Sequence, residues 1–126
     1  MHLDTHVVAW LFAGRVDHLP PAVRRRLDTE PLMISPIVEL ELAYLYEIGR
    51  TSQPAGVVLP ELRSSLGLTV SDTPFRSVVV AATALVWTRD PFDRLIVAQA
   101  ITEDQPLLTT DEQIRKHCDL AVWNTH

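Results

Sequence analysis

Four acidic residues, Asp4, Glu41, Asp93 and Asp111, are the side chains of this 126-residue chain best suited to chemistry. Asp4 and Asp111 each follow an expected strand, and Asp93 lies in the first turn of an expected helix. Ligands of open parallel sheets bind beyond the carboxyl ends of the strands, where the following helices begin. The spacing therefore predicts that these carboxylates meet at one edge of a sheet.

A group of carboxylates points to a divalent metal. Three or four carboxylates held close together repel and raise one another's pKa values unless a cation lies among them. Oxygen ligands suit Mg²⁺ or Mn²⁺, and two such ions can stabilise the attacking and leaving oxygens during phosphodiester cleavage. The four acids therefore indicate metal-dependent phosphoryl chemistry.

The acids at expected helix starts also have an ordinary structural explanation. Asp4 can cap the free N–H groups of the helix that follows it. Asp90 can cap a helix in which Asp93 is a favourable acid of the first turn. Thr109 and Glu112 fit a capping box, which makes Asp111 a first-turn acid as well. Considered singly, none of these acids requires a catalytic role.

Glu41 is harder to explain by local structure. At 100° per residue, a helix from Pro36 to Gly49 places Glu41 near the centre of an apolar stripe, while Glu39 faces the other way. The stripe consists of Ile37, Val38, Leu40, Tyr44, Leu45 and Ile48. A buried carboxylate needs a cation or strong donors. We expect Glu39 to be solvated, and Glu41 to face either a metal or an arginine such as Arg94.

Hydrophobic periodicity and turn residues predict strands that alternate with helices. The expected helices span residues 5–13, 20–27, 36–49, 57–66, 74–87, 90–103 and 110–117, the fifth with a start signal at residues 71–74, and the expected strands span 1–4, 32–35, 68–70, 107–108 and 120–122. Such alternation implies a parallel sheet with helices on both faces. We expect one α/β domain over residues 1–126 with a short, mostly parallel central sheet.

Composition limits the class of protein. A chain that is 47% hydrophobic and 21% charged is ordinary for a folded domain. A net charge of −5 argues against bulk coating of nucleic acid but leaves room for a local basic patch. The longest apolar run, 78–87, is too short to cross a bilayer, no signal peptide is recognisable, and the one cysteine, Cys118, is expected to be buried. These features predict a cytoplasmic protein without membrane association.

Four segments of the chain resemble the motifs of PIN-domain ribonucleases, specifically the VapC-type toxins of bacterial toxin–antitoxin pairs. They are residues 3–6 (LDTH), 35–42 (SPIVELEL), 90–100 (DPFDRLIVAQA) and 108–111 (LTTD). All four occur in order and at similar spacing, and the resemblance covers nearly the whole chain. It implies a single PIN-like domain.

The same resemblance implies a Mg²⁺- or Mn²⁺-dependent endoribonuclease in which bound metal lowers the pKa of a water that attacks the phosphodiester. Asp4, Glu41, Asp93 and Asp111 correspond to the family's four acids, with Thr109 as a supporting hydroxyl. Asp90 is either an auxiliary ligand or only the helix cap. The RNA target, for example tRNA or rRNA, stays open.

The resemblance also implies partners. Arg89, Arg94 and Arg115 lie near the motifs, where they contact RNA phosphates or stay solvated. An antitoxin protein is implied, and the apolar segments 7–12 and 78–87 predict either a homodimer or antitoxin interface or additional core packing. Two other functions remain open: a non-catalytic PIN-like binding module, and a DNA-directed nuclease with the same metal site.

Overall fold

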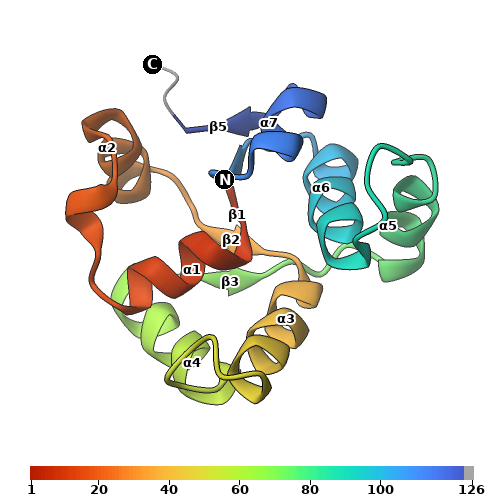
Figure 1. The fold of residues 1–126 in the computed structure, drawn as a ribbon. Coiled ribbons are helices and arrows are strands. Elements are labelled where there is room, and N and C mark those ends of the chain that lie inside the picture. The colour runs from red at the N-terminus through yellow and green to blue at the C-terminus, as the bar shows by residue number, and fades with distance from the viewer. Residues whose placement is uncertain (124–126) are drawn as a thin grey trace.

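Five short parallel strands form the centre of the computed structural model, which describes residues 1–123 (Figure 1). They are β1 (His2–Leu3), β2 (Met33–Ile34), β3 (Thr69–Val70), β4 (Leu107–Leu108) and β5 (Ala121–Val122), in the spatial order β3-β2-β1-β4-β5. Every neighbouring pair is parallel. The predicted α/β class is confirmed, while the last three residues of the predicted domain lie outside the described part.

Helices follow the strands as the sequence predicts. They are α1 (Thr5–Phe12), α2 (Pro21–Thr29), α3 (Pro36–Glu47), α4 (Ala55–Leu66), α5 (Phe75–Ala82), α6 (Pro91–Glu103) and α7 (Glu112–His117), with a short 3-10 helix over Val16–His18. Figure 1 shows α1, α2 and α4 on one side of the sheet and α5 and α6 on the other. Among residues 1–123, no helix is long and apolar enough to span a bilayer.

The core lies between the sheet and these helices. The strands contribute Leu3, Ile34, Leu107 and Leu108, each at most 1% exposed. Burial of one such side chain stabilises the fold by about 1.5–3 kcal/mol. Cys118 belongs to the same core, as predicted. The three central strands, β2, β1 and β4, are therefore the most buried, and the carboxyl ends of the strands lie next to the helix starts.

Helix α5 ends at Ala82, whereas the apolar run predicts a helix to Trp87. The Thr83 hydroxyl donates to the Val80 carbonyl at 2.6 Å, and the chain then turns so that Leu85 and Trp87 pack against the core. A threonine hydroxyl that binds a nearby carbonyl competes with helix continuation. The predicted length of this helix was therefore wrong.

Helix α5 starts where the sequence predicts, directly after the start signal at residues 71–74. No side chain caps the helix. The hydroxyls of Ser71 and Thr73, which lie within that signal, both donate to Glu103 of α6 instead.

The buried face of helix α3 differs from the apolar stripe that the sequence predicts. Leu40, Tyr44 and Ile48 are 58%, 46% and 48% exposed, and the buried residues are Val38, Glu41, Leu42 and Leu45. Tyr44 stacks on Phe92 of α6 with ring centroids 5.8 Å apart. The apolar stripe was broader than the surface available to cover it. Glu41 remains buried because it lies near the centre of the predicted stripe and still within the edge of the observed buried face.

Candidate metal centre

Asp4 connects the sheet to two helices. It follows β1 and caps α1, with Oδ1 accepting from the Thr5 N–H at 2.7 Å. Its Oδ2 accepts from the Thr109 hydroxyl at 2.6 Å, and the side chain is only 5% exposed. Because β1 pairs with β4, residues 105 positions apart meet here. The predicted cap is confirmed, but the carboxylate also faces the start of α7.

Thr109 and Asp111 are arranged differently from the predicted capping box. The fully buried Thr109 hydroxyl accepts from the Asp111 N–H at 3.0 Å while donating to Asp4. Asp111 itself caps α7, since its carboxylate accepts from the Ile114 N–H at 2.9 Å. The capping box was wrong because β-pairing turns Thr109 toward Asp4.

Glu41 enters the centre from α3. It is 9% exposed and accepts a 2.5 Å hydrogen bond from the Thr5 hydroxyl. Burial raises its pKa, and the negative charges of Asp4 and Asp90 add to this, against the lowering effect of the hydrogen bond. Within residues 1–123 it has no ion pair, because Arg94 donates through Nε to the Thr88 carbonyl at 2.9 Å. The predicted alternative, a salt bridge to Arg94, is therefore wrong.

The negative charges of four other acids act on Asp93. Burial, followed by the charges of Asp90, Asp4, Asp111 and Glu41, raises the pKa of Asp93 to about 7. Asp90 caps α6, accepting from the N–H groups of Phe92 and Asp93 at 2.8 and 3.2 Å. The charges of Asp90, Asp4, Asp111 and Glu41 all reach Asp93, so the four predicted acids lie near one another, at the starts of α1, α6 and α7 and in α3.

Burial is the main cause of the unusual electrostatics at Asp4 as well. It raises the pKa of this carboxyl, although the hydrogen bonds from Thr109 and Thr5 and the charge of His6 act in the opposite direction. In the described residues, no three acidic, histidine or cysteine side chains already surround one point as metal ligands would. The structure therefore shows carboxylates on a shared edge rather than a closed ligand shell.

Thr5 is the member of the site that the sequence did not identify. Its side chain is fully buried, its N–H binds Asp4, and its hydroxyl binds Glu41. The available signal was its place directly after Asp4 in the first motif. A threonine at N1 of a helix reads locally as an ordinary residue, and only the approach of α3 gives its hydroxyl a carboxylate.

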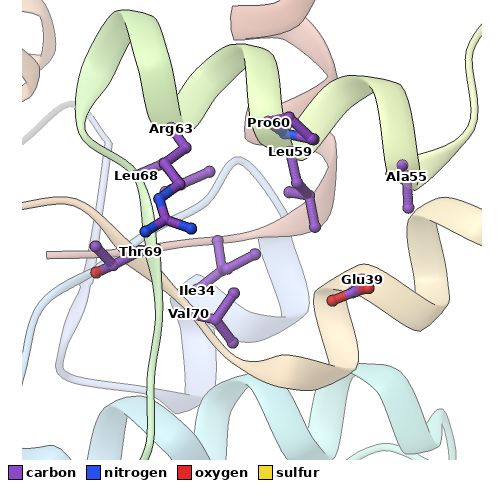
Figure 2. A pocket seen from close by; sticks show the side chains of 10 residues that line it. Ile34, Glu39, Ala55, Leu59, Pro60, Arg63, Leu68, Thr69 and Val70 are labelled. Carbon is purple, nitrogen blue, oxygen red and sulfur yellow. The ribbon is translucent and has the colours of Figure 1, made fainter.

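A cavity of about 490 Å³ lies away from these acids, beneath α4 and beside the edge strand β3 (Figure 2). It is lined by residues of β2, β3, α3 and α4, including Glu39 and Arg63. Glu39 is exposed, as predicted, and faces a different side of α3 from Glu41. The choice of Glu41 over Glu39 as the inward acid is confirmed.

Comparison with known proteins identifies the fold family. The family model described as PIN domain matches residues 1–120. Ribonuclease VapC22 from Mycobacterium tuberculosis (strain ATCC 25618 / H37Rv) is 31% identical over 118 residues, which cover 91% of this chain and 89% of that protein. The crystal structure of VapBC2 from Rickettsia felis, bound to a DNA fragment from their promoter, has a TM-score of 0.66 at 19% identity and covers 96% of this chain and 94% of the other. The chain belongs to the PIN domain family.

Proposed function

We propose that this chain is a Mg²⁺- or Mn²⁺-dependent endoribonuclease that serves as the toxin of a toxin–antitoxin pair. The main observation is Asp93, whose pKa is raised to about 7 by burial and by four neighbouring acids. A carboxylate in these surroundings is stabilised in its charged form by a nearby cation. The similarity to ribonuclease VapC22 and to VapBC2 supports the assignment to RNA cleavage and to a toxin.

The donor set fits a hard divalent cation. Asp4, Glu41, Asp93 and Asp111 offer carboxylate oxygens, which are the ligands that Mg²⁺ and Mn²⁺ prefer. Asp4 and Glu41 are buried, so a cation among them would offset the cost of burying their charges. When bound, such an ion lowers the pKa of a water and neutralises charge on the phosphate.

The chain's own residues have separable roles in this proposal. Asp4, Glu41, Asp93 and Asp111 would hold the ion, while the Thr5 and Thr109 hydroxyls fix the orientation of Glu41 and Asp4. Hydrogen bonds that orient metal ligands are a general requirement for affinity.

Asp90 and the three nearby arginines stand outside this ligand set. Asp90 is assigned to capping, since one of its carboxylate oxygens accepts two N–H groups of α6. Arg89 and Arg94 each donate one N–H group to a backbone carbonyl, which leaves the others for RNA phosphates, as for the exposed Arg115.

Two protein partners belong to the proposal. A cognate antitoxin would silence the enzyme in the cytoplasm. A second copy of the chain would cover the outer side of α5 and the segment that follows it, where Val79, Val80 and Val86 are 39%, 57% and 65% exposed. Apolar side chains of this kind are typical of homodimer interfaces. The Val80→Glu variant should sediment as a monomer under conditions where the parent is a dimer; a monomeric parent would contradict this part of the proposal.

The test is cleavage of total cellular RNA by purified, antitoxin-free protein with Mg²⁺ or Mn²⁺, with an EDTA control. We expect Asp93→Asn to lose roughly 100-fold or more of the activity. Asp104→Asn is the matched control, because it removes the same charge from an exposed position at the other end of α6.

Each outcome separates the competing functions. Cutting that requires both metal and Asp93 supports the proposed nuclease. Absence of cutting by folded protein with either metal would favour a non-catalytic binding module. Metal-dependent cutting of single-stranded DNA, with RNA left intact, would instead indicate the DNA-directed nuclease.

A further inference from the structure

A second cavity, of about 430 Å³, lies between α1, α3 and the loop of residues 48–54 that joins α3 to α4. Buried side chains of Leu42, Leu45 and Val58 line its inner part. Exposed polar side chains line its rim: His6, Arg15, Arg50, Ser52 and Gln53. The cavity thus combines an apolar floor with two guanidinium groups and further hydrogen-bonding side chains.

The two arginines are positioned by the same backbone device. Gly14 and Gly49, which end α1 and α3, have φ values of 73° and 78°, a conformation that favours glycine. In each case the next residue is an arginine whose N–H donates to a carbonyl five residues earlier. Arg15 donates to the Trp10 carbonyl at 3.0 Å, and Arg50 donates to the Leu45 carbonyl at 2.8 Å. These are the closures of helix C-caps. The backbone of each arginine is therefore fixed by a helix C-cap, and both side chains line the same cavity.

Neither of these guanidinium groups forms an ion pair or a side-chain hydrogen bond within residues 1–123. By contrast, Arg26 pairs with Glu30, and Arg89 and Arg94 donate to backbone carbonyls. A helix C-terminus stabilises a nearby cation but does not fill the five-donor fork of an arginine. Although the chain has a net charge of −5, the cavity is locally positive, and the N–H donors of its two guanidinium groups are available to a ligand.

The cavity lies near the proposed metal centre, and His6 is the residue that connects the two. His6 borders the cavity and lies close enough to Asp4 and Glu41 for its charge to lower their pKa values, against the larger raising effect of burial. Helix α1 rises about 12 Å over its length. Half-buried Trp10 lines the same cavity and offers an aromatic face. A strand of nucleic acid lying along α1 would therefore meet the carboxylates at one end and the arginines at the other.

We propose that this cavity binds the single-stranded RNA segment that flanks the scissile phosphate, with Arg15 and Arg50 each contacting a backbone phosphate and a base lying against Trp10. The inference rests on the proposed ribonuclease function and adds the surface on which the strand next to the cut lies. A cavity of about 430 Å³ admits a nucleotide but not a double helix. Guanidinium forks suit phosphate oxygens, and stacking on an aromatic ring requires an unpaired base.

The test measures binding of a short, fluorescently labelled single-stranded RNA by anisotropy, at several salt concentrations with Mg²⁺ present. The parent carries Asp93→Asn so that the probe stays intact. Adding Arg15→Gln and Arg50→Gln should weaken binding roughly tenfold or more at low salt. The slope of log K against log salt should fall by about 0.7 for each phosphate contact removed, hence by about 1.4. Arg24→Gln with Arg25→Gln on α2 is the charge-matched control, since both side chains are exposed.

A weaker, less salt-dependent complex in the cavity variant alone supports the inference. Equal weakening in the α2 control would reduce the effect to net charge and overturn it, as would unchanged binding in the cavity variant. Arginine-dependent binding of polyglutamate, with RNA binding unaffected, would assign the cavity to an acidic protein partner and also overturn it. If the parent binds no RNA and the wild-type protein cleaves none, the proposed function fails as well, which is a different result from failure at the cavity alone.

Discussion

The two ends of helix α6 carry carboxylates in opposite situations. At the first turn, Asp93 is surrounded by other acids, and burial together with their charges raises its pKa to about 7. At the last turn, Glu103 is also partly buried, which by itself raises its pKa. There, however, Ser71, Gln99, His2 and Thr73 all bind the carboxylate, and their hydrogen bonds together lower the pKa to about 2.

The difference separates an acid with a structural role, Glu103, from the proposed metal ligand Asp93. Glu103 joins β1, the segment after β3 and α6, and its negative charge is satisfied by the protein itself. Within residues 1–123, Asp93 has no comparable donors to stabilise its charged form. Burial alone does not distinguish the two; the hydrogen-bond donors around each carboxylate do.

The largest expected effect is on folding. Glu103→Ala should lower the free energy of unfolding by about 3 kcal/mol, because it leaves buried His2 and Gln99 without their carboxylate partner. Asp93→Ala should cost far less when metal is absent. Urea unfolding in EDTA measures both, with Glu61→Ala as an exposed helical control. Equal losses at Asp93 and Glu103 would remove the contrast between the two ends.

Bound Mg²⁺ should stabilise the charged form of Asp93 at the first turn of α6. Mg²⁺ at about 100 times its Kd should stabilise the parent protein by about 2.7 kcal/mol. We expect most of this gain to disappear in Asp93→Asn, while Asp104→Asn keeps it. Thermal unfolding at increasing Mg²⁺ concentrations provides the measurement. Full stabilisation of Asp93→Asn would exclude this carboxylate from the ion's ligands.

A smaller effect is expected at Thr109. Its hydroxyl donates to Asp4, as the hydroxyls of Ser71 and Thr73 donate to Glu103. Thr109→Val should cost about 1–2 kcal/mol, because Asp4 loses a buried donor and the Asp111 N–H loses an acceptor. The pKa of Asp4 should rise further. Urea unfolding and a carboxyl titration by NMR test both expectations, with the neighbouring Thr110→Val as control. An unchanged Asp4 titration would show that the hydroxyl does not stabilise its charge.

The metal-free protein should also show a pH dependence of stability. The pKa of Asp93 is higher folded than unfolded, so the folded state binds the proton more tightly and this contribution declines as pH rises from about 4 to about 7. The lowered pKa of Glu103 acts in the opposite sense, and its contribution is lost as pH falls from about 4.5 to about 2. Urea midpoints across this range should decline less steeply toward neutral pH in Asp93→Asn. An identical profile would show that Asp93 titrates normally.

The sequence predicted the parts of the site that depend on local spacing. The helix caps at Asp4 and Asp90 follow from the residue types next to the expected helices. The inward position of Glu41 follows from helical phase, even though Leu40 and Tyr44 proved to be exposed. These features are decided within one or two turns of chain, where propensity and periodicity are informative.

The remaining features depend on contacts between distant segments. The Thr5 hydroxyl finds Glu41 36 residues away, and Ser71 finds Glu103 32 residues away. Helix α5 ends early, and the residues after it return to the core, although its apolar run continues. No local pattern records which strands become neighbours. Strand order and the second partners of the caps therefore had to come from the structure.

The pairing of β1 with β4 also governs when the site can exist during synthesis. During synthesis, Asp4 is made 105 residues before its hydroxyl partner, Thr109. Chains grow by only about 5–20 residues per second, so the first acid waits several seconds for its neighbours. A nascent chain that stops before β4 has neither Thr109 nor Asp111 and cannot assemble the proposed metal centre. A toxin built in this order can become active only after β4 and the residues that follow it have been made.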